Sequence, residues 1–325
     1  MDKKHFTIGL DLGGTNSVFG LVDDSNKIKA TTTIKTQEYE YAWEFVADSI
    51  NAINEMITIA GGIDNIKALG IGAPCGNIKD GTIEHAANIR WAKDVVPLAK
   101  MFSDSLGIPV ATTNDAKAAA LGELRFGAAK GMQNFIEITL GTGVGSGIVA
   151  NGQLIYGCDG LAGELGHTII DFNNGRKCGC GRSGCLDMYC STRGVIITAK
   201  EIIKECSEDS ILRRTGDKDI TTLDIFNAAQ NGDKIAIEVF RKTGETLGKA
   251  CANFATFLSP EAFIFFGGLA KAGDLLLKPI EDTYNKFVLS FYKNKAKFIS
   301  SGLEDGTAAI LGAAAVGIEA YERTK

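Results

Sequence analysis

The sequence predicts an α/β protein of two related domains, and three observations support this. Strand-like and helix-like patterns alternate along most of the chain. The length of 325 residues, with 45% hydrophobic and 22% charged residues, suffices for two soluble domains with cores of their own. A strand–turn–strand pattern also occurs twice, with Leu12 aligned to Leu140 at an offset of 128 residues.

The repeat joins residues 6–22 and 136–149, each with a strand, a turn of glycine and threonine, and a second strand. Such turns present backbone amides and a hydroxyl that can bind phosphate oxygens. Two of them on opposite sides of a cleft would suit an enzyme that handles nucleotides. Chance matching of glycines explains the repeat equally well when it is taken alone.

In the first part of the chain, runs of β-branched and apolar residues predict strands at residues 5–12, 17–22, 27–35, 66–73 and 109–112. Apolar residues at helical spacing predict helices at residues 40–60, 95–106 and 116–125. Two further strands, joined by glycines, are expected within residues 135–149.

The later part is mainly helical, with apolar stripes that predict helices at residues 222–230 and 233–258. An apolar strand then ends at Gly267 and Gly268 before a further helix, whose N-terminal amides could meet an anion or a nucleotide. A tight turn without any ligand is the alternative. The alanine-rich helix expected at residues 306–323 should return to the first domain.

The composition excludes several classes of protein. A formal net charge of -5 provides no basic surface for nucleic acid, and the longest apolar runs are far shorter than a membrane span. The sequence shows no signal peptide, and several cysteines are scattered through apolar segments as in a reducing compartment. A cytoplasmic enzyme is therefore expected, with no membrane or nucleic-acid partner.

Residues 163–187, here called the cysteine segment, contain His167, Cys178, Cys180 and Cys185. Three thiolates and one imidazole form a complete tetrahedral set for structural zinc, and the intervening glycines let a short backbone wrap around the ion. Ordinary core cysteines are an alternative, although the neighbouring arginines and lysine make the setting polar. A disulfide is the other alternative.

The family resemblance rests on five motifs in order: D-L-G-G-T (11–15), N-D-A (114–116), L-G-T-G-V-G-S-G-I (140–148), G-E-L-G-H (163–167) and C-G-C-G-x-x-G-C-L-D (178–187). Together they resemble the ROK family of sugar kinases and repressors, and within it the bacterial ATP-dependent glucokinases. The resemblance covers nearly the whole chain. It implies an actin-like ATPase fold, a duplicated ribonuclease H-like architecture with an interdomain cleft.

The resemblance implies a smaller domain at residues 1–114 plus 305–325 and a larger one, with the zinc site, at 115–304. The implied reaction is transfer of the γ-phosphoryl group of ATP to the 6-hydroxyl of a hexose, with glucose as the first candidate. Asp115 matches the family's catalytic aspartate, and a carboxylate at this position would accept the hydroxyl proton. The alternative is that Asp115 only caps the helix that follows it.

For the nucleotide, the resemblance implies that Asp11 lies near Mg²⁺ and that the phosphates and adenosine contact two turns and a glycine pair: Gly13, Gly14 and Thr15; Gly141, Thr142 and Gly143; Gly267 and Gly268. For the sugar, it implies contacts from Asn88, Asn114, Asp115, Glu164, His167 and Asp187, with His167 also a zinc ligand. The family usually has glutamate in place of Asp187 and glycine in place of Cys75.

Kinases of N-acetylmannosamine, fructose or allose are the alternative enzymes. A sugar-responsive regulator is the alternative of another class, but the first motif starts close to Met1 and no basic recognition helix precedes it, so we expect no DNA-binding domain. The family resemblance suggests a homodimer or homotetramer.

Overall fold

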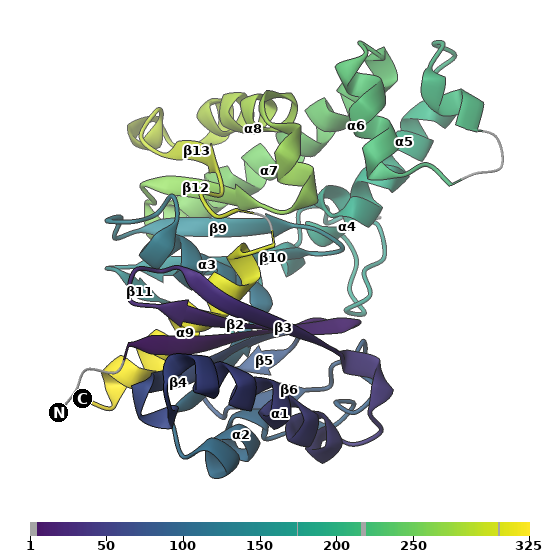
Figure 1. Cartoon of the computed structure of the whole chain (residues 1–325). Coiled ribbons are helices and arrows are strands. Elements are labelled where there is room, and N and C mark those ends of the chain that lie inside the picture. The colour runs from purple at the N-terminus through teal and green to yellow at the C-terminus, as the bar shows by residue number, and fades with distance from the viewer. Residues whose placement is uncertain (1–4, 174, 216–218, 305) are drawn as a thin grey trace. The chain divides into compact units, whose positions relative to one another are not determined.

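The computed structural model describes residues 5–173, 175–215, 219–304 and 306–325 (Figure 1). Contacts within the chain group it into two compact units. Unit 1 comprises Met1–Gly131, Gly147–Gly163 and Gly302–Lys325, and unit 2 comprises Met132–Ser146 and Glu164–Ser301. The domain limits expected from the sequence stay a prediction, and the helix that begins at Asp115 is grouped with unit 1.

Unit 1 contains a five-stranded sheet of order β3-β2-β1-β4-β8. Its strands are β1 (Phe6–Leu12), β2 (Asn16–Asp23), β3 (Ile28–Lys35), β4 (Ile66–Ala73) and β8 (Val110–Asn114). The first three pair antiparallel because short turns join them, whereas β4 and β8 continue the sheet in parallel with β1. All five lie where the sequence predicts them. Because β1, β4 and β8 are parallel, their carboxyl ends share one edge, which places Asp11 and Asn114 at that edge.

The helices of unit 1 are α1 (Ala42–Ala60), α2 (Leu98–Leu106), α3 (Asp115–Phe126) and α9 (Ala308–Arg323). Short strands β5 (Gly76–Asn77), β6 (Thr82–Glu84) and β7 (Val95–Val96) form a small antiparallel sheet. The predicted start of α2 at Val95 was wrong. Val96 precedes Pro97, and a proline disfavours the helical conformation in the residue before it, so β7 is extended and α2 begins only at Leu98.

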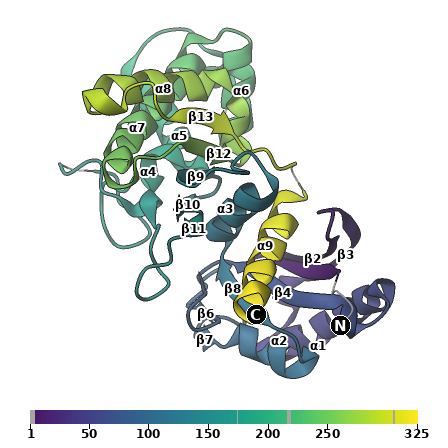
Figure 2. The same cartoon turned by 90° about the vertical axis from the view of Figure 1, so that its left-hand side faces the viewer.

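The two faces of this sheet are covered differently. Phe45 and Ile53 of α1 and Phe102 of α2 are fully buried in one core cluster together with side chains of β1 and β4. Helix α9 approaches the sheet more closely, because a Cβ atom on Gly9 would lie 2.3 Å, and one on Gly70 1.9 Å, from a backbone oxygen of that helix. Figure 2 shows α9 in yellow alongside β4. The predicted return of the last helix to the first part of the chain is confirmed.

Unit 2 contains β9 (Phe135–Leu140), β12 (Ala262–Phe266) and β13 (Lys297–Ser300), with β12 parallel to both neighbours. After β9 the chain forms β10 (Val144–Ala150), which begins in unit 2 and ends in unit 1, where it pairs with β11 (Gln153–Leu154). The helices are α4 (Asp187–Cys190), α5 (Thr192–Glu205), α6 (Thr222–Gln230), α7 (Lys234–Leu258) and α8 (Asp274–Phe287).

The segment after β12 differs from the prediction. The paired glycines lead into a short 3₁₀ helix, Gly268–Ala272, and α8 begins only at Asp274. Gly267 and Gly273 have φ values of 102° and 56°, so left-handed backbone at both ends separates this turn from α8. No helix in the described part of the chain has the length and apolar character that crossing a membrane requires.

Candidate active site and metal cluster

The first glycine turn, residues 13–15, joins β1 to β2. The Gly13 N–H donates to the Asn16 carbonyl at 3.0 Å, and a Cβ atom on Gly13 would lie 2.8 Å from that oxygen. A Cβ atom on Gly14 would lie 3.4 Å from the Asn88 side chain, so the predicted sugar residue Asn88 is next to the predicted phosphate turn. The structure therefore brings these two predicted site elements together within unit 1.

Gln37 is a residue of this site that the sequence analysis missed. Its amide nitrogen donates to the backbone carbonyls of Gly14 and Asn88, and its amide oxygen accepts from the Arg90 N–H at 3.2 Å. Gln37 thus joins the glycine turn to the loop that carries Asn88. No motif or spacing in the sequence indicates this contact, because Gln37 and Asn88 are far apart along the chain.

Asn114 and Asp115 lie at the junction of β8 and α3. The Asn114 side chain caps α3 by accepting from the Ala116 N–H at 2.9 Å, and Asp115 Oδ1 accepts from the same N–H at 2.8 Å. Asp115 is the first helical residue and Asn114 is the cap. Asn114 therefore occupies the cap position, and the Asp115 carboxylate shares the same N–H, so the helix end and the proposed base role both involve Asp115.

The carboxyl groups of Asp11 and Asp115 both have raised pKa values. Burial raises the pKa of Asp115, partly opposed by the hydrogen bond from the Ala116 backbone. Burial, together with the charge on Asp115, raises the pKa of Asp11 to about 6. Two neighbouring carboxyl groups that resist ionisation form a site in which a bound cation would be stabilised and in which one group can serve as a base.

We expect Asp11→Asn to stabilise the metal-free protein at pH 7 by about 3 kcal/mol. The folded-state pKa of Asp11 lies above the unfolded value, so folding disfavours its charged form; stability falls as pH rises from about 4 to about 6 and stays lower above that. Urea unfolding at pH 7 and pH 4 measures this, and the gain should vanish at pH 4.

Asp23→Asn is the matched control for this prediction. Hydrogen bonds from Lys29 and Ser25 hold the pKa of Asp23 below its usual range, so its replacement should destabilise the protein at pH 7. If both substitutions changed the free energy of unfolding at pH 7 in the same direction and by the same amount, the carboxylate of Asp11 would not be destabilised by burial.

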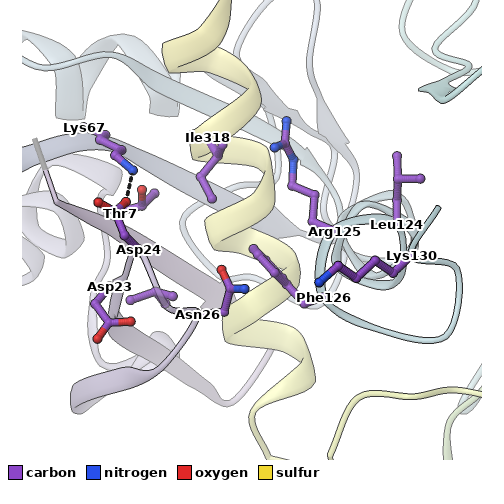
Figure 3. A pocket seen from close by; sticks show the side chains of 11 residues that line it. Thr7, Asp23, Asp24, Asn26, Lys67, Leu124, Arg125, Phe126, Lys130 and Ile318 are labelled. Atoms are coloured by element: carbon purple, nitrogen blue, oxygen red, sulfur yellow. Dashed lines mark hydrogen bonds and ion pairs between the residues drawn. The ribbon is translucent and has the colours of Figure 1, made fainter. Parts of the chain in front are cut away.

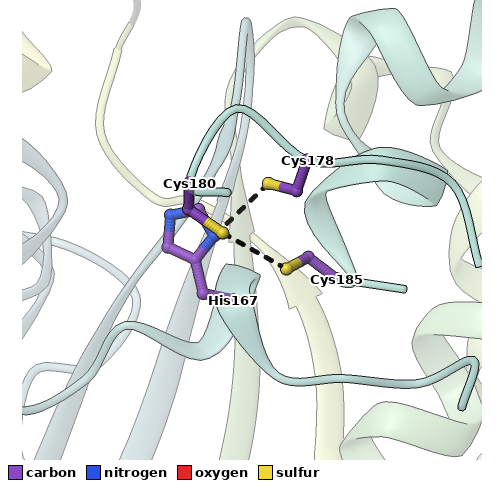
Figure 4. Close-up of side chains that lie close together, drawn as sticks. All are labelled: His167, Cys178, Cys180 and Cys185. Atoms are coloured by element: carbon purple, nitrogen blue, oxygen red, sulfur yellow. Dashed lines mark hydrogen bonds between the residues drawn. The ribbon is translucent and has the colours of Figure 1, made fainter. Parts of the chain in front are cut away.

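The four predicted metal ligands come together in unit 2 (Figure 4). The ligand atoms of His167, Cys178, Cys180 and Cys185 all lie within 4.8 Å of one another. Cys178 Sγ is 3.7 Å from His167 Nδ1, and Cys180 Sγ is 3.6 Å from Cys185 Sγ. Tetrahedral thiolates with Zn–S bonds of about 2.3 Å would lie about 3.8 Å apart, so the cluster fits zinc.

The alternatives for these cysteines do not fit the geometry. None of the eight cysteines forms a disulfide, which excludes the disulfide alternative in this structure, and Cys180 is exposed, unlike a core cysteine. A hydrogen bond from the Arg182 backbone lowers the pKa of the Cys180 thiol to about 6, whereas burial raises the pKa of the Cys185 thiol to about 12, so Cys180 is the more easily ionised of the two. Left-handed glycines, Gly181 and Gly184, allow the tight turn around the cluster.

The second glycine turn, residues 141–143, joins β9 to β10. The Gly141 N–H donates to the Gly143 carbonyl at 3.0 Å. Asp187, expected to contact the sugar, places Oδ1 2.7 Å from the Val144 N–H that follows this turn. This hydrogen bond links the second glycine turn to the predicted metal cluster, because Asp187 lies two residues after Cys185.

An apolar cavity of about 270 Å³ lies beside Gly268, and it is lined by Thr222, Leu223, Phe226, Phe240, Gly268, Leu269, Lys271 and Ala272. Gly267 packs against the end of β9, where a Cβ atom would lie 2.6 Å from the Leu140 carbonyl oxygen. The glycine pair therefore lies between this cavity and the second glycine turn. A flat apolar base would fit such a cavity, with its phosphates near the turn.

A second cavity, of about 400 Å³, lies in unit 1 (Figure 3). Several of its charged groups form ion pairs among the described residues, including Lys67 with Asp24 and Arg125 with Glu322. None of the predicted site residues lines it. We assign it no part in the site.

Comparison with known proteins decides the family. Residues 7–319 match the family described as "ROK family". The chain belongs to the ROK family. A glucokinase of Halalkalibacterium halodurans is 36% identical over 90% of this chain and 88% of its own length. A xylose repressor of Caldicellulosiruptor bescii is 33% identical over 77% of this chain and 62% of the repressor.

Among solved structures, this ROK protein is similar to a ROK glucokinase from Streptomyces griseus in complex with glucose and AMPPNP. The TM-score is 0.77 with 33% identity, over 97% of this chain and 99% of that one. The likeness confirms the expected α/β fold of the actin-like ATPase type.

The predicted site residues of the ROK chain divide between the units. Unit 1 carries Asp11, Gly13, Gly14, Thr15, Asn88, Asn114 and Asp115. Unit 2 carries Gly141, Thr142, Gly143, Glu164, His167, Asp187, Gly267, Gly268 and the three cysteines predicted to bind the metal. Glu164 directly precedes the 3₁₀ turn Leu165–His167, and its carbonyl accepts from the His167 N–H at 3.0 Å.

Proposed function

We propose that this protein is an ATP-dependent hexose kinase that transfers the γ-phosphoryl group to the 6-hydroxyl, with glucose as the first candidate. The observation that carries the proposal is Asp115, a buried carboxylate of raised pKa next to Asn114 in a ROK chain with glucokinase relatives. A sugar hydroxyl is a poor nucleophile, and a carboxylate with a raised pKa is a stronger base than an exposed aspartate.

In the proposed reaction, Asp115 accepts the proton of the 6-hydroxyl while the hydroxyl oxygen of the sugar attacks the γ-phosphorus. The leaving oxygen of ADP lies in line with the attacking oxygen. Asn88, Asn114, Glu164 and His167 orient the remaining hydroxyls, since carboxylate, amide and imidazole groups provide both donors and acceptors. The backbone link of Asn88 to the first glycine turn supports this placement, because the sugar and the phosphate must lie side by side.

The nucleotide is assigned to the two glycine turns and the apolar cavity. Backbone amides of both turns and the Thr15 hydroxyl would bind phosphate oxygens, and the adenine would occupy the cavity beside Gly268. Asp11 would hold Mg²⁺ directly or through water, and the raised pKa of its carboxyl reflects a site suited to a cation. When bound, Mg²⁺ would neutralise part of the negative charge of the phosphates.

The cluster of His167 and the three cysteines is proposed to hold one structural zinc. His167 presents Nδ1 to the thiols, so Nε2 points elsewhere and can serve the sugar. Zinc would thereby hold His167 and the neighbouring Glu164 in place.

A cytoplasmic location and the absence of a nucleic-acid partner stay predictions. The predicted homodimeric or homotetrameric state can be measured by light scattering.

A coupled assay that measures ADP release with glucose, N-acetylmannosamine, fructose or allose as the substrate tests the function. We expect the highest kcat/KM with glucose. A higher kcat/KM with another of these sugars would replace glucose as the substrate. Sugar binding without turnover in the presence of ATP and Mg²⁺ would favour the regulator alternative.

We expect Gln37→Ala to raise the KM values for both sugar and ATP by roughly tenfold, with a smaller effect on kcat. Its side chain bonds the backbone of the first glycine turn and of the Asn88 loop, so its loss should loosen both sites together. Steady-state kinetics with each substrate varied in turn measures this. Gln153→Ala, at an exposed position on β11, is the control. Unchanged KM values for Gln37→Ala would mean that the bridge does not position the site.

A further inference from the structure

The N–H and the carbonyl of Val144, immediately after the second glycine turn, both contact the cysteine segment. On one side the Val144 N–H donates to Asp187 Oδ1 at 2.7 Å. On the other side a Cβ atom on Gly166 would lie only 1.9 Å from the Val144 carbonyl oxygen, so the backbone at Gly166 packs directly on that carbonyl. Val144 itself is buried, so its amide depends on these contacts and not on water.

Two further hydrogen bonds extend this contact along β10 and into the turn. The Leu165 N–H donates to the Ser146 hydroxyl at 3.1 Å. The Thr192 N–H, just after α4, donates to the Gly141 carbonyl at 2.8 Å. The turn between Leu140 and Val144 is therefore attached at its beginning and at its end to residues that flank the metal cluster.

The two residues that contact Val144, Gly166 and Asp187, lie near opposite ends of the cysteine segment. Gly166 directly precedes His167, and Asp187 lies two residues after Cys185, so they flank the first and the last metal ligand. Because both ends of this segment contact the backbone of Val144, the segment connects the geometry of the cluster to that of the turn. Asp187 Oδ1 also lies 3.1 Å from the place that a Cβ atom on Gly143 would take, which is tight contact with the turn itself.

We propose that Asp187 is a positioning residue for the ATP phosphates: by accepting from the Val144 N–H, it fixes the second glycine turn to the cysteine segment. This differs from the sugar contact that the family resemblance implies, and it rests on the proposed assignment of the turn to ATP. Removal of the acceptor leaves a buried N–H without this hydrogen bond, and the turn should then sample other conformations. The affinity for nucleotide should fall more than the affinity for sugar.

The test compares Asp187→Ala with Asp187→Asn, because an asparagine keeps an oxygen that can accept from Val144. Binding of AMPPNP without sugar and of glucose without nucleotide is measured by calorimetry, and exchange of the Val144 amide is measured by NMR without either. For Asp187→Ala we expect amide exchange at least about tenfold faster and AMPPNP affinity about tenfold weaker, with glucose affinity within about twofold of wild type. Asp187→Asn should recover most of both losses.

Asp171→Ala is the matched control, because Asp171 also belongs to the cysteine segment but bonds Asn173 and Tyr189 instead of the turn. It should leave Val144 exchange and AMPPNP affinity unchanged. A larger loss of glucose affinity than of AMPPNP affinity in Asp187→Ala, or an unchanged Val144 amide, overturns the positioning role. A wild-type protein that binds no AMPPNP overturns the proposed function and this inference together, whereas wild-type binding that Asp187→Ala retains overturns the inference alone.

Discussion

Asp115→Asn is expected to lower kcat on the preferred hexose by about 10²–10⁴-fold, while the affinity for AMPPNP stays within about twofold of wild type. The amide keeps the size of the side chain and an oxygen that can accept from the Ala116 N–H, as Asp115 Oδ1 does. It cannot accept the proton of the sugar hydroxyl. The phosphates are assigned to the glycine turns, so nucleotide binding does not depend on the carboxylate. Steady-state kinetics and calorimetry measure the two quantities.

The pH dependence gives an independent check on this base. Burial raises the pKa of Asp115, so kcat/KM for the wild type should fall with falling pH at a value above the usual range for aspartate. Asp104→Asn, an exposed change in an ion pair with Lys100, should leave both kcat and this profile unaltered. Near-wild-type turnover of Asp115→Asn on every hexose tested would show that Asp115 only assists Asn114 at the helix end.

Cys180→Ser should abolish metal binding, and the sugar affinity should fall with it by about tenfold or more. Wild-type protein should contain about one zinc per chain, because His167 and the three thiols form a complete tetrahedral set. A serine hydroxyl is a poor substitute for a thiolate ligand. Without the ion, His167 and the adjacent Glu164 lose the centre that orients them. Elemental analysis and glucose calorimetry measure the two effects.

Cys158→Ser is the control for the zinc prediction, since Cys158 is an exposed free cysteine outside the cluster. Both zinc content and glucose affinity should be retained. A metal-free preparation of the wild type with unchanged sugar kinetics would contradict the proposed role of zinc.

The sequence by itself determined most of the secondary structure and the four residues of the histidine–cysteine cluster. β4 (Ile66–Ala73) and α6 (Thr222–Gln230) lie at the predicted residues, because periodic apolar patterns and flanking turn residues are local properties of the chain. The cluster of His167, Cys178, Cys180 and Cys185 was predictable for a similar reason, because residues that can bind a metal and glycines are concentrated in one short segment. The boundary errors occurred where glycine or proline altered the backbone, as before α2 and before α8. Helix α5 and strand β13 were not predicted from the sequence.

Only the tertiary structure decided how these parts support one another. The contact of Gln37 with Asn88, the hydrogen bond from Val144 to Asp187, and the division of the helix end between Asn114 and Asp115 have no signature in the sequence. The first two join residues far apart along the chain, and such contacts depend on how sheets, helices and loops pack. The third is local but depends on side-chain rotamers at one helix end. Sequence patterns specify which residues can serve the chemistry, whereas packing specifies which backbone groups hold them in position.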